Sequence, residues 1–202
     1  MLVKVCGMRD PQNIEAIENM GANWMGFIFY PKSPRFVDTK PLYLPTKAKR
    51  VGVFVNEAID TIRSISEQYQ LDIVQLHGSE TPDECAELQE AELTVMKALQ
   101  VKDKFPTALS KSYQQACRYL LFDTQTKGYG GSGNKFDWHI LADYHGDTPF
   151  LLSGGISVDD AQSILKINHP QLVGVDINSR FETQPGIKNV ALVQQFINQI
   201  RQ

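Results

Sequence analysis

The strongest constraint on the fold is the regular alternation of short apolar runs with longer amphipathic segments along the 202 residues. Several apolar runs are nearly continuous, which is typical of strands buried on both faces of a parallel sheet. The predicted strands are residues 2–6, 24–29, 51–55, 72–77, 93–99, 118–123, 149–154 and 172–176. Strict alternation of strands and helices produces either an open doubly wound sheet or a closed barrel.

Eight strand–helix units without a break in composition favour the barrel. We therefore predict an α/β protein, a (β/α)8 TIM barrel of eight parallel strands that forms a single domain over residues 1–202. The first helix has a clear start, because Asp10 can cap it and Pro11 has no N–H to leave unpaired. Further helices are predicted at residues 58–69, 80–90, 107–117, 137–143, 159–167 and 187–201, with one irregular helical turn before residue 50.

The composition is that of a soluble globular protein, with 42% hydrophobic residues, 21% charged residues and a net charge of −3. Both signs of charge are mixed along the chain, so nothing predicts a nucleic-acid partner. No apolar stretch reaches the roughly 18 residues of a membrane span, and MLVKVCGMRD is too short and polar for a signal peptide. Cys6, Cys85 and Cys117 form no CxxC pair, so we expect reduced cytosolic thiols and no metal site.

A (β/α)8 barrel carries its catalytic groups at the C-terminal ends of the strands. The first predicted strand ends in Lys4, Val5 and Cys6. Alternation puts Lys4 and Cys6 on one face and the two valines, Val3 and Val5, on the other. We expect the valines to meet the outer helices and Lys4 and Cys6 to face into the barrel, with Cys6 at its mouth. The alternative is that Cys6 is a small buried hydrophobic side chain.

Three other strand ends carry polar side chains. Arg35 lies in a proline-stiffened loop after the second strand, and its planar guanidinium suits a carboxylate; a solvated basic loop is the alternative. His77 ends the fourth strand, where a structural histidine is the alternative reading. Asp123 ends the sixth strand beside Phe122, and an apolar setting would keep it protonated as an acid. A turn or helix-capping role is the alternative for Asp123.

A glycine-rich loop, GYGGSG at residues 128–133, formally matches the dinucleotide-binding pattern G-x-G-x-x-G. Its context argues against that interpretation, because the loop belongs to the sixth unit and does not directly follow a strand. It also lacks the Lys and Ser/Thr of a P-loop after its last glycine. We predict instead a mobile loop that folds over a site, with a flexible linker as the alternative.

The last two strands end in residues suited to an anion. Gly154 and Gly155 precede a helix and let an oxyanion approach backbone N–H groups closely. Asn178 and Ser179 follow the eighth strand with short polar side chains, and Arg180 adds a positive charge. The loops after strands 7 and 8 are where such barrels bind phosphate, so together they predict a phosphate site.

These strand ends, in this order, resemble those of phosphoribosylanthranilate isomerases. The matching segments span nearly the whole chain: KVCGMR, GFIFYPKSPRFV, VGVFVN, VQLHGSE, FD with GYGGSG and FDW, LSGGI, GVDINS with Glu182, and PGIK. The resemblance implies an isomerase of tryptophan biosynthesis. It would convert N-(5'-phosphoribosyl)anthranilate to 1-(2-carboxyphenylamino)-1-deoxyribulose 5-phosphate by an Amadori rearrangement.

The resemblance also implies roles for individual residues. Cys6 would be the general base and Asp123 the general acid. Arg35 would hold the anthranilate carboxylate, Asp176 would contact sugar hydroxyls, and His77 would line the pocket. The implied phosphate-binding residues are Gly154, Gly155, Asn178 and Ser179.

The implied chemistry needs no metal and no cofactor, because the iminium formed on ring opening serves as the electron sink. The cysteine must act as a thiolate, so it needs a nearby cation. Lys4 is the candidate for that cation at Cys6. Asp123 must stay protonated, and we expect Phe122 and closure of the glycine-rich loop to supply an apolar setting.

One departure from the family concerns the loop after the eighth strand. The family usually has Ser-Ser-Gly-Val-Glu where this chain has Asn-Ser-Arg-Phe-Glu at residues 178–182. Arg180 in place of glycine reduces backbone freedom and puts the loop geometry in doubt, or it adds a charge for the phosphate. An inactive ligand-binding relative is therefore kept as an alternative.

Another phosphosugar-binding barrel enzyme is the other alternative. Histidine-pathway isomerases would favour aspartates at the ends of strands 1 and 5, where this chain has Cys6 and Ala98-Leu99. We expect a small phosphorylated substrate, no nucleic acid or membrane partner, and a cytoplasmic monomer or homodimer. The sequence leaves open the acceptance of a histidine-pathway aminoaldose and the roles of His77 and Arg180.

Overall fold

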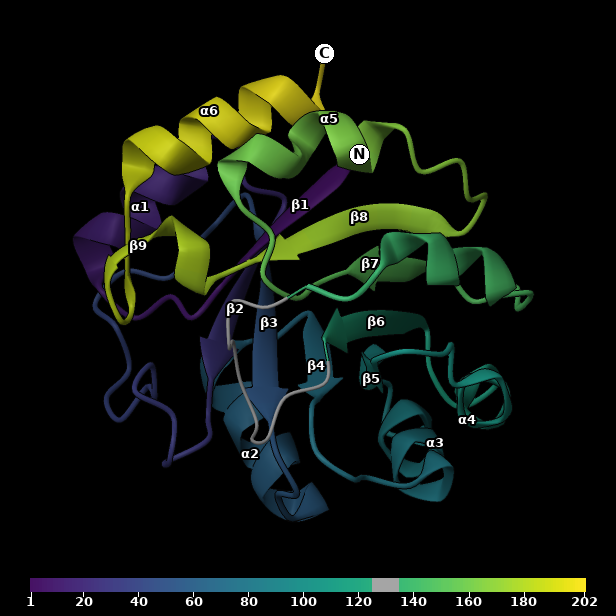
Figure 1. Ribbon diagram of the computed structural model, residues 1–202. Helices are drawn as coiled ribbons and strands as arrows, with labels where there is room; N and C mark the ends of the chain where they lie inside the picture. Colours follow the sequence, from purple (N-terminus) through teal and green to yellow (C-terminus); the bar gives the residue numbers. More distant parts are fainter. Residues whose placement is uncertain (125–134) are drawn as a thin grey trace.

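The computed structural model describes residues 1–124 and 135–202, and within them eight parallel strands close into a barrel in chain order (Figure 1). The strands are β1 (Leu2–Cys6), β2 (Trp24–Ile28), β3 (Lys49–Phe54), β4 (Ile73–Leu76), β5 (Val95–Val101), β6 (Tyr119–Thr124), β7 (Phe150–Leu152) and β8 (Leu172–Ile177). The barrel closes where β1 pairs with β8, with Lys4 opposite Asp176. The predicted barrel fold is confirmed.

The helices lie outside the strands (Figure 1). They are α1 (Pro11–Asn19), α2 (Ile59–Tyr69), α3 (Pro82–Glu90), α4 (Thr107–Tyr113), α5 (Ala161–Leu165), α6 (Val190–Ile200) and the 3₁₀ turns η1 (Trp138–Asp143), η2 (Val158–Asp160) and η3 (Ser179–Phe181). A hairpin of β9 (Glu182–Gln184) and β10 (Ile187–Lys188) follows η3. In the two described stretches, no helix has the length and apolarity needed to cross a membrane.

The helix starts follow from local hydrogen bonding. The carboxylate of Asp10 accepts the N–H of Asn13 at 2.8 Å, and Pro11 occupies the first turn of α1, as predicted. Thr81 and Glu84 form a reciprocal capping box at α3. The predicted helix over 137–143 forms instead as the 3₁₀ turn η1, with Asp137 as its cap.

The segment between β2 and β3 contains no helix, so the irregular helical turn predicted before residue 50 is wrong. A buried carboxylate organises this segment instead. Glu18 of α1 accepts the backbone N–H groups of Thr46, Lys47 and Ala48 at 2.7, 2.6 and 3.0 Å. These bonds satisfy backbone donors that a helix would otherwise have paired internally.

Apolar side chains fill two layers on either side of the strands. The inner layer, which closes the barrel below its mouth, consists of Trp24, Val51, Ile73, Met96, Ala98, Leu121 and Leu151. The outer layer packs under the helices and contains Val3 and Val5. Strand alternation therefore places Lys4 and Cys6 on the inner face, as predicted. Because the lower barrel is packed, a ligand can enter only from the C-terminal ends of the strands.

Candidate active site

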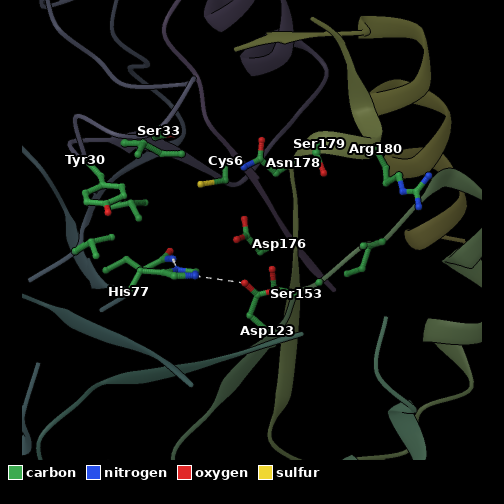
Figure 2. Close-up of a pocket in the computed structure, with 17 residues that line it drawn as sticks. Cys6, Tyr30, Ser33, His77, Asp123, Ser153, Asp176, Asn178, Ser179 and Arg180 are labelled. Carbon is green, nitrogen blue, oxygen red and sulfur yellow. Dashed lines mark hydrogen bonds and ion pairs between the residues drawn. The ribbon is translucent and has the colours of Figure 1, made fainter. Parts of the chain in front are cut away.

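A pocket opens at the C-terminal ends of the strands. Its lining residues are Cys6, Ile28, Tyr30, Ser33, Val53, Val55, Gln75, His77, Asp123, Ser153, Gly154, Gly155, Ile156, Asp176, Asn178, Ser179 and Arg180. Figure 2 shows Cys6 and Asp123 both directed toward this space, from β1 and β6. The structure thus brings every predicted site residue except Arg35 to the wall of one pocket.

Asp123 lies in a line of polar side chains that crosses from β4 to β6 (Figure 2). Its Oδ2 is 3.3 Å from Nε2 of His77, and its Oδ1 accepts the N–H of Thr124 at 2.9 Å. Nδ1 of His77 is in turn 2.8 Å from Nε2 of Gln75. Gln75 was not predicted as a site residue, although it lies two residues before His77 and therefore points to the same inner face.

The prediction that Phe122 gives Asp123 an apolar setting is wrong. Phe122 points to the opposite side of β6, where its ring lies 5.0 Å from that of Phe105, 5.2 Å from that of Tyr144 and 4.8 Å from that of Phe150. Alternation along a strand sends adjacent side chains to opposite faces, so Phe122 cannot cover its neighbour's carboxyl group. The glycine-rich loop expected to close over the site lies outside the described residues.

Cys6 shares the barrel interior with a buried ion pair. Nζ of Lys4 lies 2.9 Å from Oδ1 of Asp176, and their side chains are 0% and 6% exposed. Burial raises the pKa of the Cys6 thiol above its ordinary value, although Lys4 acts in the opposite direction. Lys4 was the candidate cation for the Cys6 thiolate, and it does act to lower the pKa of Cys6. Burial outweighs it, because Asp176 already partly balances the charge of Lys4.

Gly26 on β2 makes room for the Cys6 sulfur. A Cβ atom placed on Gly26 would lie 2.7 Å from Sγ of Cys6, closer than non-bonded atoms can approach. The sequence contained a weak signal for this role, because a glycine in a buried strand often marks a close approach of another group.

Arg35 lies beside the pocket, and Glu182 orients its side chain. Nε of Arg35 donates to Oε1 of Glu182 at 2.8 Å, and Nη2 donates to Oε2 at 2.6 Å. This contact uses one edge of the guanidinium group, and the edge formed by Nη1 and Nη2 keeps donors for a second carboxylate. Arg35 Cδ would lie 2.7 Å from a Cβ on Gly7, which follows Cys6 in the chain, so Arg35 lies close to Cys6.

Glu182 also connects Arg35 with the loop after β8. Its Oε1 accepts Nζ of Lys188 at 2.6 Å and the N–H of Gly186 at 3.0 Å. Lys188 is fully buried and donates a second hydrogen bond, 2.6 Å long, to Oδ1 of Asn178. The side chain of Asn178 is therefore held from behind the loop. Lys188 was not predicted as a site residue, although it ends the PGIK segment that resembles the family.

The loops after β7 and β8 meet at one side of the pocket (Figure 2). Gly154 and Gly155 have φ angles of +94° and +65°, in the region that favours glycine. A Cβ on Gly154 would also lie 2.7 Å from the backbone nitrogen of Thr124. Ser179 and Arg180 line the pocket opposite them. Backbone N–H groups at such a glycine pair can surround an oxyanion.

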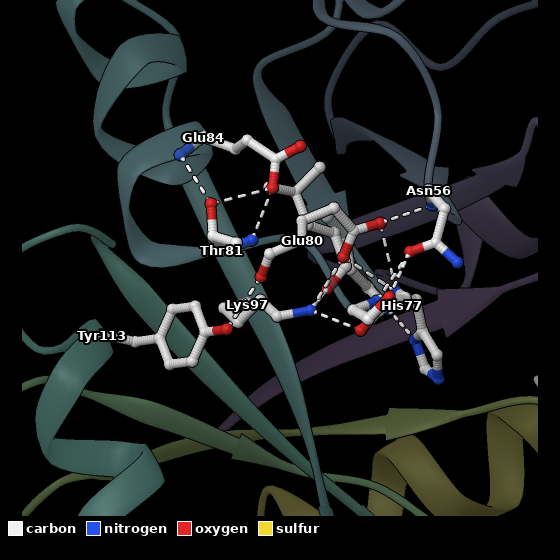
Figure 3. A network of polar contacts seen from close by, with 11 residues as sticks. Asn56, His77, Glu80, Thr81, Glu84, Lys97 and Tyr113 are labelled. Atoms are coloured by element: carbon white, nitrogen blue, oxygen red, sulfur yellow. Dashed lines mark hydrogen bonds and ion pairs between the residues drawn. The ribbon is translucent and has the colours of Figure 1, made fainter.

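A second buried polar network fixes the end of β4 from the outer side (Figure 3). Nζ of Lys97 donates to the carbonyl oxygens of Leu76 and Gly78 at 3.2 and 2.7 Å, and to Oε2 of Glu80 at 2.8 Å. These bonds hold the backbone on both sides of His77. The network does not line the pocket, so its contribution is to position β4.

Comparisons with known proteins agree with this geometry. Residues 3–199 match the sequence model of the N-(5'-phosphoribosyl)anthranilate (PRA) isomerase family. The N-(5'-phosphoribosyl)anthranilate isomerase of Phocaeicola vulgatus is 48% identical over 202 residues, which cover 100% of this chain and 98% of the relative.

Two solved structures share the whole fold. Monomers generated from the dimeric phosphoribosylanthranilate isomerase of Thermotoga maritima superpose with a TM-score of 0.82 at 30% identity, covering 100% and 98% of the two chains. A phosphoribosylanthranilate isomerase in complex with reduced 1-(o-carboxyphenylamino)-1-deoxyribulose 5-phosphate has a TM-score of 0.80 at 30% identity, with the same coverage. The chain described here belongs to the N-(5'-phosphoribosyl)anthranilate isomerase family.

Proposed function

We propose that this protein catalyses the isomerisation of N-(5'-phosphoribosyl)anthranilate to 1-(2-carboxyphenylamino)-1-deoxyribulose 5-phosphate in tryptophan biosynthesis. One observation carries the proposal: a thiol, Cys6, and a carboxyl group, Asp123, line the same pocket as two loops suited to phosphate. An aldose–ketose rearrangement needs an acid and a base at one ligand, and a phosphorylated ligand needs an anion site beside them.

The reaction begins with ring opening by Asp123. The carboxyl group gives its proton to the ring oxygen of the ribose as the C1'–O bond breaks, and the anthranilate nitrogen forms a double bond to C1'. The product of this step is a protonated Schiff base, and Asp123 is left as a carboxylate. His77 at 3.3 Å can donate a hydrogen bond to that carboxylate and stabilise it.

Cys6 then removes the proton from C2'. The electrons of the C2'–H bond form the C1'–C2' double bond, and the electron pair of the C=N bond moves to the iminium nitrogen. This step therefore requires neither a metal nor a coenzyme. Burial raises the pKa of Cys6 in the free protein. The positive iminium beside the sulfur opposes that shift, so the substrate itself favours the thiolate. The resulting enolamine tautomerises to the ketone.

Three side chains would orient the reacting carbons. Arg35 would bind the anthranilate carboxylate through the guanidinium edge that Glu182 leaves available. Asp176, already paired with Lys4, would accept sugar hydroxyls with its second oxygen. Together these contacts would hold C2' near the sulfur, and positioning of this kind accounts for much of enzymatic rate acceleration.

The phosphate would bind where the loops after β7 and β8 meet, at Gly154, Gly155, Asn178 and Ser179. Because Lys188 already holds the Asn178 side chain, we expect this residue to contribute through its backbone. Arg180, which stands where the family usually has glycine, lines the same pocket and would add a charge-assisted contact to the phosphate. We further propose a single catalytic domain over residues 1–202 that works in the cytoplasm as a monomer or homodimer.

A turnover assay tests the proposal. The purified protein and synthesised phosphoribosylanthranilate should show loss of the anthranilate-amine fluorescence, and an inactive ligand-binding relative would bind without that loss. Cys6→Ser and Asp123→Asn should each lower kcat by about 10² to 10⁴-fold with KM little changed. Arg35→Ala should mainly raise KM. Near-full turnover in Cys6→Ser would show that the base is assigned wrongly.

A further inference from the structure

Gln75 lies behind Asp123 in the line of polar side chains from β4 to β6. Its side chain is buried, and its Nε2 lies 2.8 Å from Nδ1 of His77. The opposite ring nitrogen, Nε2 of His77, lies 3.3 Å from Oδ2 of Asp123. The imidazole therefore connects the amide to the carboxyl group.

The direction of these contacts fixes the form of the imidazole. An amide nitrogen can only donate, so Nδ1 of His77 must accept the hydrogen bond from Gln75. A ring whose Nδ1 accepts is neutral and carries its hydrogen on Nε2. The hydrogen on Nε2 is on the side of the ring that contacts Asp123, with Nε2 3.3 Å from Oδ2.

We propose that Gln75 is a positioning residue for the isomerisation: by donating to Nδ1 it keeps His77 neutral, so that the proton held by the His77–Asp123 pair resides on Asp123. The inference rests on the function proposed above. When the pair takes up a proton, Nδ1 of His77 and the carboxylate of Asp123 compete for it. The Gln75 N–H already occupies the Nδ1 lone pair, so the carboxylate receives the proton and becomes the acid that ring opening requires.

The other end of the amide makes the orientation testable. Oε1 of Gln75 is buried and accepts no hydrogen bond from the described residues. Rotating the amide would turn Oε1 toward the imidazole and favour a proton on Nδ1. The protonation state of Nδ1 therefore distinguishes the two orientations of the amide.

Other charged and titratable groups surround this pair. Asp176 on β8 faces His77 and Asp123, and Lys4 on β1 balances its charge. Cys6 and Arg180 line the pocket from β1 and η3, and Glu80 and Lys97 lie under the backbone beside His77. Asp176 interacts with the pair electrostatically, whereas Gln75 forms a hydrogen bond with Nδ1.

Nuclear magnetic resonance of the unmodified protein tests the first step. The chain has four histidines, and uniform ¹⁵N-histidine labelling with a His77→Asn spectrum identifies the His77 resonances. We expect at neutral pH an unprotonated Nδ1 and a protonated Nε2. In Gln75→Glu the new carboxylate should accept a hydrogen bond, so Nδ1 should carry a proton. A protonated Nδ1 in the unmodified protein would overturn the proposal.

Kinetics test the second step. Gln75→Glu should lower kcat about 100-fold, near the low end of what a general acid contributes, and should change KM by less than about threefold. Gln75→Met, which lacks the donor and adds no charge, should lower kcat about tenfold. Gln68→Glu is the matched control, because it adds the same charge at an exposed position of α2 that does not line the pocket. It should keep kcat within about twofold.

The outcomes separate this proposal from the proposed function. No turnover by the unmodified protein would refute the function, whereas the tautomer of His77 would still be measured. A Gln75→Glu protein with Nδ1 protonated and unchanged kcat would show that the tautomer has no influence on the acid. If Gln75→Glu failed to fold, unchanged kcat in Gln75→Met would overturn the proposal in the same way.

Discussion

Two buried lysine–carboxylate pairs near the barrel mouth have almost the same geometry but different surroundings. Nζ of Lys4 lies 2.9 Å from Asp176 inside the barrel, and Nζ of Lys97 lies 2.8 Å from Glu80 on its outer side. The four side chains are at most 6% exposed. Lys4 lies beside Cys6, whereas Lys97 lies on the outer side of β5 near Tyr113 of α4 (Figure 3).

The difference between the pairs lies in their remaining neighbours. Lys97 donates to Glu80 and to two backbone carbonyls, so all three of its N–H groups are used. Lys4 donates to Asp176 and faces the Cys6 thiol; burial would lower its pKa, but Asp176 and Cys6 outweigh that and raise it. The three hydrogen bonds of Lys97 hold the backbone, whereas Lys4 also interacts electrostatically with Cys6, the proposed base.

Lys4→Met gives the largest expected effect. Removing one partner of a buried pair leaves Asp176 uncompensated, which should lower the free energy of unfolding by about 3–5 kcal/mol. The Cys6 thiolate also loses its nearest cation, so kcat/KM of the folded fraction should fall by about 100-fold. Urea unfolding and steady-state turnover measure the two effects. Turnover within about twofold of the unmodified protein would remove Lys4 from the chemistry.

Lys97→Met is the matched substitution at the other pair. It should cost a similar 3–5 kcal/mol of unfolding free energy, because Glu80 loses its partner. Its kcat/KM should stay within about tenfold of the unmodified value, since only the support of the β4 end is weakened. The same two measurements apply. An equal loss of activity in both variants would contradict the distinction between the pairs.

Alkylation of Cys6 tests the difference between the Lys4 and Lys97 pairs without measuring turnover. Burial raises the pKa of this thiol, so the thiol is the favoured form at neutral pH and the reactive thiolate increases as pH rises toward that pKa. The alkylation rate of Cys6, followed by peptide mass spectrometry with iodoacetamide, should rise about tenfold per pH unit from pH 7. Lys4→Met should move this rise to higher pH, and Lys97→Met should leave it in place. A rate independent of pH would contradict the assigned shift.

Much of the barrel could be predicted from the chain, because strand alternation is a local property. The same period placed Lys4 and Cys6 inside and the flanking valines outside, and the structure agrees. The same alternation in β6 sends Phe122 and Asp123 to opposite faces, so it would also have excluded Phe122 as a cover for Asp123. Strand alternation was therefore informative in β6 too, where we relied instead on the two residues being adjacent in the sequence.

The remaining features depend on contacts between distant segments. Glu182 joins Arg35 and Lys188, which are 147 and 6 residues away from it in the chain, and no motif records such a contact. The pKa of Cys6 depends on a balance between burial and a cation already paired with Asp176, which needs coordinates to evaluate. Gln75 could have been found from its spacing to His77, but its unpaired oxygen could not.

Tyr113→Phe gives the smallest expected effect and tests the structural pair alone. The Tyr113 hydroxyl donates to the backbone oxygen of Glu80 at 2.7 Å, and burial raises the pKa of Tyr113 to about 12. A folded-state pKa above the unfolded value of about 10 stabilises the protein below pH 10, and this contribution is lost as pH rises from 10 to 12.

The phenylalanine variant should lose about 1 kcal/mol of unfolding free energy at pH 7 and should show a shallower decline of stability above pH 10, measured by urea unfolding at each pH. Tyr144→Phe is the control for turnover alone: that hydroxyl donates to Thr148 in a different cluster, but burial raises the pKa of Tyr144 too, so this variant should also show a shallower decline above pH 10. Turnover at pH 7 should stay unchanged in both. An activity loss specific to Tyr113→Phe would mean that the Lys97 cluster does more than hold the end of β4, and that saturation of a buried lysine does not identify a structural role.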